Sequence, residues 1–292
     1  MGVGGGVNPS PKGKKGFGRG SSLDHLRPKG LVGFNTYPGI SRIELMQSKA
    51  GIIKPRDPVL WNVEALKTMH GDIQDDVMEI FSPPRVAKKI HEMGFKCSVS
   101  ADLETGWDLG MHYMRQNLIA HVKARKPQVM ILSPPCTFFS CVMASNWFRM
   151  ERLSRENAFL QALQFLEFCC LLMDMQISEG RRVIFEHPFR ALSWQHPEIE
   201  ALSQVEGMRN IKFDMCMFGM VSPIEKVPLK KTTIFLTNVD TLVPKMSKKM
   251  CRGTHSMHKT IEGMEGNIKL SRWAQKYPDP LCEAIAEAIS EL

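Results

Sequence analysis

A cysteine and a glutamate each follow a short apolar run, and together they could present a nucleophile and an acid to one substrate. Cys136 comes directly after Pro134 and Pro135, which follow the apolar run 129–132. Prolines cannot donate the hydrogen bonds of a central strand, so they end the strand and stiffen the turn. A thiol on a rigid turn at the carboxyl edge of an α/β sheet is suited to nucleophilic attack. A buried, inert cysteine is the alternative interpretation.

The second element is the segment 182–188, with the sequence Arg-Val-Ile-Phe-Glu-His-Pro. It predicts a short apolar strand that ends at Glu186 and is stopped by Pro188. Two parallel strands that end near Cys136 and Glu186 would place both side chains over one crevice. A solvated acid at the end of a strand is the alternative for Glu186.

The segment 133–140 has the sequence Ser-Pro-Pro-Cys-Thr-Phe-Phe-Ser and resembles the Pro-Pro-Cys-x-x-Phe-Ser signature of the DNA cytosine-5 methyltransferases. Around Glu186 the chain has Glu-His-Pro where that family has Glu-Asn-Val. The segment 227–236 is similar to the family's Gln-x-Arg-x-Arg strand, and 274–286 resembles its last motif. The resemblance covers about residues 77–292 and suggests a divergent branch of the kind that mobile elements or viruses carry.

The resemblance implies transfer of a methyl group from S-adenosylmethionine to carbon 5 of cytosine in DNA. The Cys136 thiolate would attack carbon 6, and Glu186 would protonate ring nitrogen 3. Lys230 or Lys231, which replace the family's arginines, would hold the base carbonyl or a phosphate. The target base must be flipped out of the duplex. The residues predicted to contact the substrate are Ser140, His187, Arg252 and His255.

Two alternatives to a DNA methyltransferase stay open at this point. An RNA cytosine-5 methyltransferase would use the same chemistry on a different nucleic acid. A catalytically inactive, nucleic-acid-binding relative is the alternative from another class, because the chain departs from the family's cofactor turn.

That turn follows a predicted strand at 77–81. The family's Phe-x-Gly-x-Gly-Gly turn cradles S-adenosylmethionine, but this chain has Phe-Ser-Pro-Pro-Arg over 81–85, without a glycine. Prolines offer no amide donors. Arg85 is therefore the predicted partner of the cofactor's carboxylate, because a guanidinium binds a carboxylate bidentately.

An acid at the end of the second strand commonly binds the ribose hydroxyls of a nucleotide-like cofactor. Asp102 is in that place, with Glu104 as the second choice. Asp108 is predicted to contact the adenine or, equally, to cap the helix expected over 112–125. The full set of predicted cofactor contacts is Phe81, Ser82, Arg85, Asp102, Asp108 and Pro134.

The order of apolar and amphipathic segments predicts an α/β fold of the Rossmann-like, S-adenosylmethionine-dependent methyltransferase type, with a mostly parallel sheet. Strands are expected at 77–81, 95–100, 128–132, 182–186, 211–218 and 232–237. Helices are expected at 85–93, 112–125, 154–178 and 279–291.

Composition divides the 292 residues into five regions. A basic, glycine-rich tail over 1–33 is predicted to be disordered, and 34–75 to be an irregular lead-in. The catalytic core follows over 76–238, then a small target-recognition-like insertion over 239–268. Residues 269–292 bring a last helix back to the core. The net charge of +8 fits a polyanionic partner such as DNA.

The chain has eight cysteines without a C-x-x-C pair and no signal peptide, and no apolar run is expected to be long enough to span a membrane. These features predict an intracellular protein, with the nucleus as one candidate compartment, and no membrane partner. Cys251, His255 and His258 fall within eight residues, and Cys216 could add a fourth metal ligand. The spacing is not that of a standard zinc finger, so no metal is predicted. The interpretation preferred for this segment is a polar loop that faces the nucleic acid.

Overall fold

The computed structural model describes residues 1–2, 63–70, 74–140, 143 and 146–292. Apart from Met1 and Gly2, the tail predicted to be disordered over 1–33 lies outside the described residues. The lead-in over 34–75 also lies outside the described residues, except for helix α2 (Val63–His70) and residues 74 and 75.

A six-stranded mixed sheet, in the order β2-β1-β3-β4-β6-β5, organises the described part of the chain. Its strands are β1 (Val77–Ile80), β2 (Ser100–Ala101), β3 (Val129–Leu132), β4 (Arg182–Pro188), β5 (Arg209–Asp214) and β6 (Thr232–Thr237). The first four strands are mutually parallel, and β6 runs antiparallel between β4 and β5. The mostly parallel α/β class predicted from the sequence is confirmed, and the sheet is compatible with a Rossmann-like fold.

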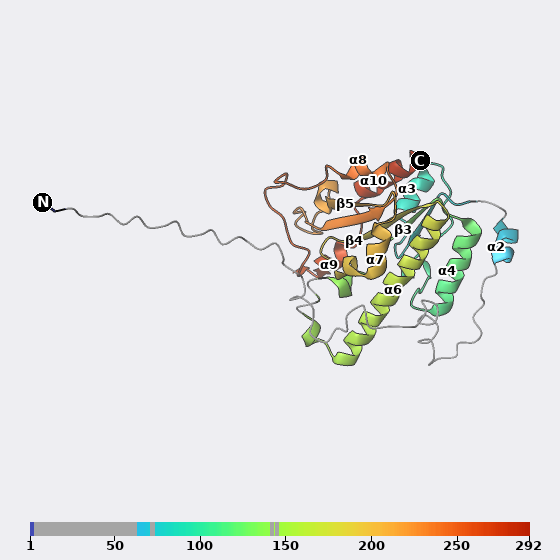
Figure 1. Ribbon diagram of the computed structural model, residues 1–292, viewed down its shortest axis with the longest axis horizontal. Helices are drawn as coiled ribbons and strands as arrows, with labels where there is room; N and C mark the ends of the chain where they lie inside the picture. The colour runs from blue at the N-terminus through green and yellow to red at the C-terminus, as the bar shows by residue number, and fades with distance from the viewer. Residues whose placement is uncertain (3–62, 71–73, 141–142, 144–145) are drawn as a thin grey trace.

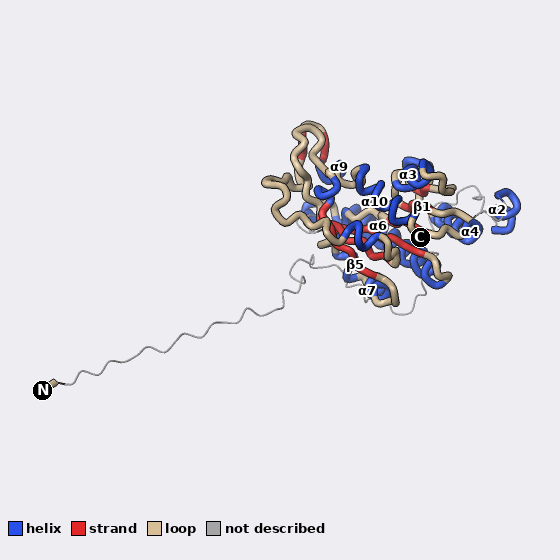
Figure 2. Tube along the Cα trace, turned by 90° about the horizontal axis from the view of Figure 1, so that it is seen from above, coloured by secondary structure: helices blue, strands red, loops and turns tan. Residues whose placement is uncertain are grey.

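Helices cover both faces of this sheet (Figure 1). Helices α4, α6 and α7 lie on one face, whereas α3, α8 and α10 lie on the other, with α3 and α10 side by side (Figure 2). Their bounds are α3 (Val86–Glu92), α4 (His112–Arg125), α6 (Arg152–Ser178), α7 (Pro197–Ser203), α8 (Leu242–Met246) and α10 (Asp279–Ser290). The short helix α9 (Leu270–Trp273) follows a two-stranded hairpin, β7 (Met264–Glu265) and β8 (Ile268–Lys269).

Side chains alternate between the two faces of each strand, so the sheet has a hydrophobic core on each face. In β1, Met78 and Ile80 pack toward α4 and α6, whereas Val77 packs toward α3. Glu79 shares the face of Val77, because side chains two apart in a strand point the same way. The connection after β1 leads outward to β2, whereas the connection after β3 leads to β4 on the other side, so the topological switch point lies between β1 and β3.

Three predicted elements differ from the structure. The strand expected over 95–100 is reduced to β2, because the Lys96 amide donates to the Asp76 carboxylate at 2.7 Å rather than to a neighbouring strand. The strand expected over 211–218 gives way after β5 to the 3₁₀ helix η6 (Met215–Phe218). Strand β4 continues through Pro188, which pairs with β6 at the strand's end, where no further amide is needed.

Helix α6 has 27 residues, and by length and composition alone it could cross a membrane. The expectation that no apolar run is long enough is therefore wrong. In the structure, α6 packs on the sheet through Leu166, Phe168 and Leu172, all fully buried. A core helix of this kind meets the same criterion of length and hydropathy.

Candidate active site

The antiparallel direction of β6 brings a lysine to the carboxyl end of β4. Lys231 directly precedes β6, and its Nζ lies 3.3 Å from Oε1 of Glu186, which β4 carries. Both residues are almost fully buried, at 6% and 5% exposure. Burial disfavours the charged ammonium, but the negative charge of Glu186 and its hydrogen bond, together with the nearby Cys136, outweigh that effect and raise the pKa of Lys231.

Only one of the two predicted lysines reaches this site. Lys230 points the other way, since neighbouring residues alternate, and its Nζ lies 3.8 Å from Asp214 Oδ2 and 3.5 Å from the Cys251 carbonyl oxygen. The sequence left Lys230 and Lys231 as equal choices. The structure places Lys231 beside Glu186 and Lys230 outside the site.

Cys136 lies in the loop after β3, directly before the 3₁₀ helix η3 (Thr137–Phe139). Because β3 and β4 are parallel neighbours, this loop leaves the sheet at the edge where Glu186 lies. Cys136 is half-buried. Burial raises the pKa of its thiol, Lys231 opposes this rise, and Glu186 adds to it. The resting cysteine is therefore a thiol, and it needs a base before it can attack.

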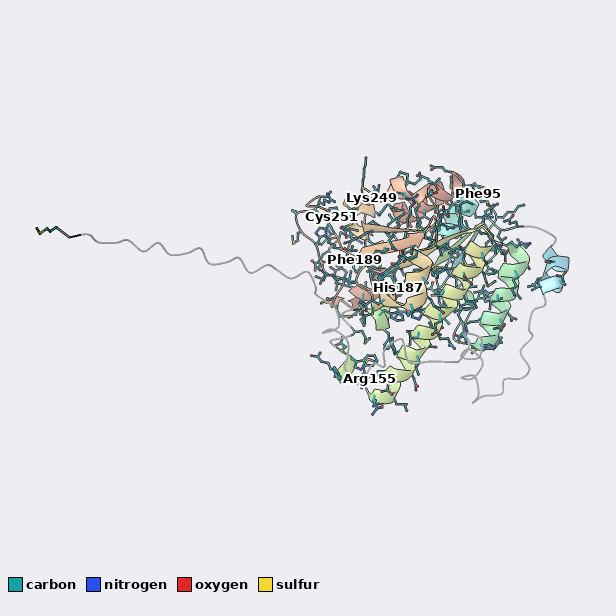
Figure 3. All side chains as sticks on the ribbon, viewed as in Figure 1. Phe95, Arg155, His187, Phe189, Lys249 and Cys251 are labelled. Atoms are coloured by element: carbon teal, nitrogen blue, oxygen red, sulfur yellow. The ribbon has the colours of Figure 1, made fainter. Side chains whose placement is uncertain are left out.

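His187, labelled in Figure 3, belongs to β4 and holds the loop before Cys136 through a hydrogen bond to Pro134. It is fully buried, and its Nε2 donates to the Pro134 carbonyl at 3.1 Å, so its Nδ1 accepts from the Ser193 hydroxyl. Burial lowers the pKa of His187 to about 3, which keeps the ring neutral. Both ring nitrogens are occupied, so the predicted contact between His187 and a substrate base is replaced by a positioning role.

Tyr277, just before α10, completes the cluster from a distant part of the chain. Its hydroxyl lies 2.9 Å from Oγ of Ser133, the first residue after β3. Burial raises the pKa of Tyr277 well above its ordinary value, and the charge of Glu186 adds to the effect. Tyr277 therefore offers a neutral phenol at the site. Sequence reasoning noted it only as a replacement for Gly-Asn in the last motif.

The turn after β1 is organised by Glu79, a residue that sequence reasoning missed. Its fully buried carboxylate accepts the amides of Arg85, Val86 and Ala87, at 2.8, 3.3 and 2.9 Å. Burial raises the pKa of Glu79, although these backbone hydrogen bonds oppose the rise. The backbone amides at the N-terminus of α3 are therefore already hydrogen-bonded to the Glu79 carboxylate. The only sequence signal for this role is the position of Glu79 between two apolar strand residues, Met78 and Ile80.

Phe81 and Arg85 border this turn. Phe81 has a φ of 59°, which a phenylalanine rarely adopts, and its ring packs 5.0 Å from that of Phe165 on α6. The buried Ser82 hydroxyl points to Glu79, at 3.4 Å. Among the described residues, no carboxylate lies within ion-pair distance of the half-buried Arg85 guanidinium. Arg85 therefore keeps its charge available at the mouth of the turn.

The two predicted aspartates both shape local turns. Oδ1 of Asp102 accepts the Glu104 amide at 2.9 Å and caps the 3₁₀ helix η2 (Leu103–Thr105). Oδ1 of Asp108 accepts the Gly110 amide at 2.9 Å, whereas Met111 is the N-cap of α4. Asp108 therefore does not cap that helix. Glu104, the second choice for the ribose, is exposed.

A cavity of about 510 Å³ lies beside the turn, between α3 and the segment 97–100. Pro84 and Trp107 line it, but neither Asp102 nor Asp108 does. It is therefore a neighbour of the predicted cofactor residues and not a pocket built by them.

The remaining predicted substrate residues are distributed over two loops. Oγ of Ser140 donates to the Thr137 carbonyl at 2.9 Å and closes the turn that follows Cys136. Arg252 is exposed. His255 does not face outward as expected, because its Nδ1 lies 3.4 Å from Sγ of Cys251.

The fold and the site together define an α/β protein with a thiol, an acid and an ammonium gathered at the carboxyl edge of a mostly parallel sheet. Neither the models of known protein families nor the curated proteins to which the sequence was compared match this chain. Its chemistry must therefore be argued from its own residues.

Removing the Lys231 charge is expected to slow alkylation of Cys136 several-fold at neutral pH. Lys231 lowers the thiol's pKa, and Lys231→Met would also leave Glu186 as a lone negative neighbour. Rates of iodoacetamide modification at Cys136, followed by peptide mass spectrometry, measure the effect. Lys231→Arg keeps the charge and should restore the rate.

Lys230→Met is the matched control, because Lys230 is adjacent in sequence and points away from Glu186. Its alkylation rate should stay at the wild-type value. Equal slowing in both methionine variants would contradict the geometry assigned to the site, provided that thermal denaturation shows both to be folded.

Proposed function

We propose that the protein is an S-adenosylmethionine-dependent cytosine-5 methyltransferase that acts on DNA through a covalent bond to Cys136. The observation that carries the proposal is the convergence of Cys136, Glu186 and Lys231 from three separate segments at one sheet edge. The likeness of the segment around Cys136 to the methyltransferase signature supports the same conclusion.

The proposed first step adds a thiol across a double bond of cytosine. The Cys136 sulfur forms a bond to carbon 6, and its proton passes to Glu186. Glu186 then delivers a proton to ring nitrogen 3, so negative charge does not accumulate on the ring. Lys231, which stays an ammonium, stabilises the Glu186 carboxylate before and after these transfers, and it can donate a hydrogen bond to the base carbonyl. Protons therefore balance within the Cys136–Glu186 pair.

The cofactor would be held by side chains rather than by backbone amides. Arg85 has a guanidinium free of carboxylate partners among the described residues, which suits the methionine carboxylate of S-adenosylmethionine. Asp102 uses one carboxylate oxygen for η2 and has a second oxygen for ribose hydroxyls. When bound, the cofactor supplies an electrophilic methyl group. Phe81, held in its unusual backbone conformation, precedes Arg85 in the same turn.

Trapping with 5-fluorocytosine DNA tests this proposal. Fluorine at carbon 5 cannot leave as a proton does, so an adduct of chain, oligonucleotide and one methyl group should persist under denaturing conditions. We expect this adduct only when S-adenosylmethionine is present, with Cys136 as the modified residue by peptide mass spectrometry.

A 5-fluorocytosine RNA hairpin, run in parallel, separates the DNA enzyme from an RNA enzyme. An adduct with RNA but not with DNA would identify the protein as an RNA cytosine-5 methyltransferase. If neither nucleic acid gives an adduct, and calorimetry detects no S-adenosylmethionine binding at millimolar concentration, the chain is an inactive nucleic-acid-binding protein and the enzyme proposal fails.

A further inference from the structure

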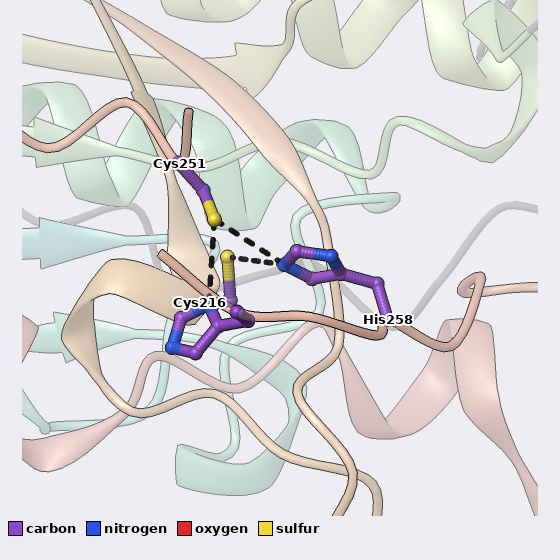
Figure 4. A group of neighbouring side chains, drawn as sticks. Cys216, Cys251 and His258 are labelled. Atoms are coloured by element: carbon purple, nitrogen blue, oxygen red, sulfur yellow. Dashed lines mark hydrogen bonds between the residues drawn. The ribbon is translucent and has the colours of Figure 1, made fainter. Parts of the chain in front are cut away.

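Four soft ligands converge at the end of the sheet opposite β2, on the side of Lys230, and none of them belongs to the Cys136, Glu186 and Lys231 group. They are Cys216, Cys251, His255 and His258, and their sulfur and nitrogen atoms all lie within 4.8 Å of one another. Figure 4 shows Cys216, Cys251 and His258 pointing toward a common centre. Sγ of Cys251 lies 3.4 Å from His258 Nε2 and 3.4 Å from His255 Nδ1, and Sγ of Cys216 lies 3.5 Å from the same His258 nitrogen.

These separations match the edges of a zinc coordination tetrahedron. With Zn–S bonds of about 2.3 Å and Zn–N bonds of about 2.0–2.1 Å, tetrahedral angles separate sulfur from nitrogen by about 3.6 Å. Two thiolates and two imidazoles in this arrangement favour zinc over the hard cations magnesium and calcium, which prefer oxygen. No carboxylate belongs to the group. Two cysteines and two histidines form a four-ligand set of the kind found in closed structural zinc sites.

The local backbone is built to bring the ligands together. Cys216 belongs to η6, directly after β5, and the other three come from the loop after α8. The Cys251 amide donates to the buried Asp214 carboxylate at 2.8 Å, which ties this loop to the end of β5. Gly253, with a φ of 86°, makes the turn that returns His255 to Cys251.

The loop has no regular secondary structure of its own. Between α8 and β7 it forms no helix or strand, and its backbone is tied to the rest of the structure mainly near Lys249 and Cys251, which bond to Asp214, and at the isolated bridge between Leu229 and Lys259. A structural zinc ion commonly replaces a hydrophobic core in segments of this kind.

We propose that Cys216, Cys251, His255 and His258 bind one structural Zn²⁺ ion that fixes the loop between α8 and β7 onto the end of β5. The sequence-based expectation of no metal followed from the missing C-x-x-C pair. The fourth ligand lies 35 positions before Cys251 in the chain and is supplied by the fold. The bound ion would fix the loop that carries exposed Arg252 and Lys248, and this loop contacts Lys230 through the Cys251 carbonyl oxygen. This metal site does not depend on the proposed methyl transfer.

The test is the metal content of the full chain. Protein produced with zinc in the medium should contain about one zinc ion per chain by inductively coupled plasma mass spectrometry. Replacement with Co²⁺ should give the intense visible bands of tetrahedral cobalt and the near-ultraviolet charge-transfer bands of thiolate ligands. Cys251→Ser and Cys216→Ser are each expected to weaken zinc binding by about 100-fold or more, measured by competition with a chromogenic chelator.

Cys97→Ser is the matched control, because Cys97 is a free cysteine outside the cluster. It should retain full zinc content. Hydrogen exchange of the wild-type chain with and without chelator adds a measurement that needs no variant, and chelation should increase exchange in 247–263 while the six-stranded sheet stays protected.

Absence of zinc from the purified chain, together with no Co²⁺ spectrum on titration, would overturn the proposal. So would octahedral cobalt without thiolate charge transfer, or equal zinc loss in Cys97→Ser and Cys251→Ser. Failure of the adduct experiment leaves the zinc content unaffected, so the two proposals fail separately.

Discussion

The Cys136→Ser variant is expected to transfer methyl groups at least about 1,000-fold more slowly than the wild-type chain, because it lacks the covalent nucleophile. A serine hydroxyl is far less ionised than a thiol at neutral pH, and the surrounding burial would disfavour the alkoxide further. The measurement is single-turnover transfer of labelled methyl from S-adenosylmethionine to cytosine-containing DNA. Serine has nearly the same shape as cysteine, so the thermal unfolding midpoint should change little.

Cys282→Ser provides the control for this experiment. Cys282 is a buried cysteine of α10, outside the Cys136 cluster, so its replacement tests the general effect of losing a thiol. The control should retain wild-type turnover. A Cys136→Ser chain that methylates at a near wild-type rate would rule out the covalent mechanism.

The Glu186→Gln variant is expected to lose about 100-fold or more in rate while it still binds the base. Glutamine keeps the shape of glutamate and can accept a hydrogen bond from Lys231, but it can neither take the thiol proton nor deliver one to ring nitrogen 3. Single-turnover rates and DNA affinity, measured on the same preparation, separate the two effects. The DNA dissociation constant should remain within a few-fold of the wild-type value.

Glu283→Gln is a suitable control, since Glu283 is a half-exposed acid that pairs with Lys89 on α3. Its turnover should be unchanged. If Glu186→Gln turns over normally, Glu186 serves only as the structural partner of Lys231. If it loses DNA binding instead, Glu186 contributes to recognition rather than to proton transfer.

Elements governed by local pattern were predictable from the sequence. Helix α4 has the bounds expected for it, 112–125, and it ends where Lys126 turns left-handed directly before Pro127, which is a local stop signal. Strands β1 and β3 also lie where the apolar runs predicted them. Strand β2 is shorter than its apolar run suggested, because the Asp76 side chain competes for a backbone amide.

The site depended on contacts between distant segments, which local pattern does not contain. The choice of Lys231 over Lys230 follows from the direction of β6 and the alternation of its side chains. The bond between Tyr277 and Ser133 joins residues 144 positions apart. Cys136 and Glu186 were identifiable because each adjoins a strand end with a proline, so the topology of a parallel sheet was enough to bring them to one edge.

Glu79 has a consequence for cofactor discrimination. Rossmann-like folds that hold dinucleotides bind the pyrophosphate with free amides at the start of their first helix. In this chain the amides of Arg85, Val86 and Ala87 are already bonded to Glu79, and the two prolines of the turn have none to offer. A polyphosphate would lose these bonds and meet a carboxylate, whereas a positively charged sulfonium compound needs no such amides. The filled helix terminus therefore selects against ATP and nicotinamide dinucleotides as ligands of this turn.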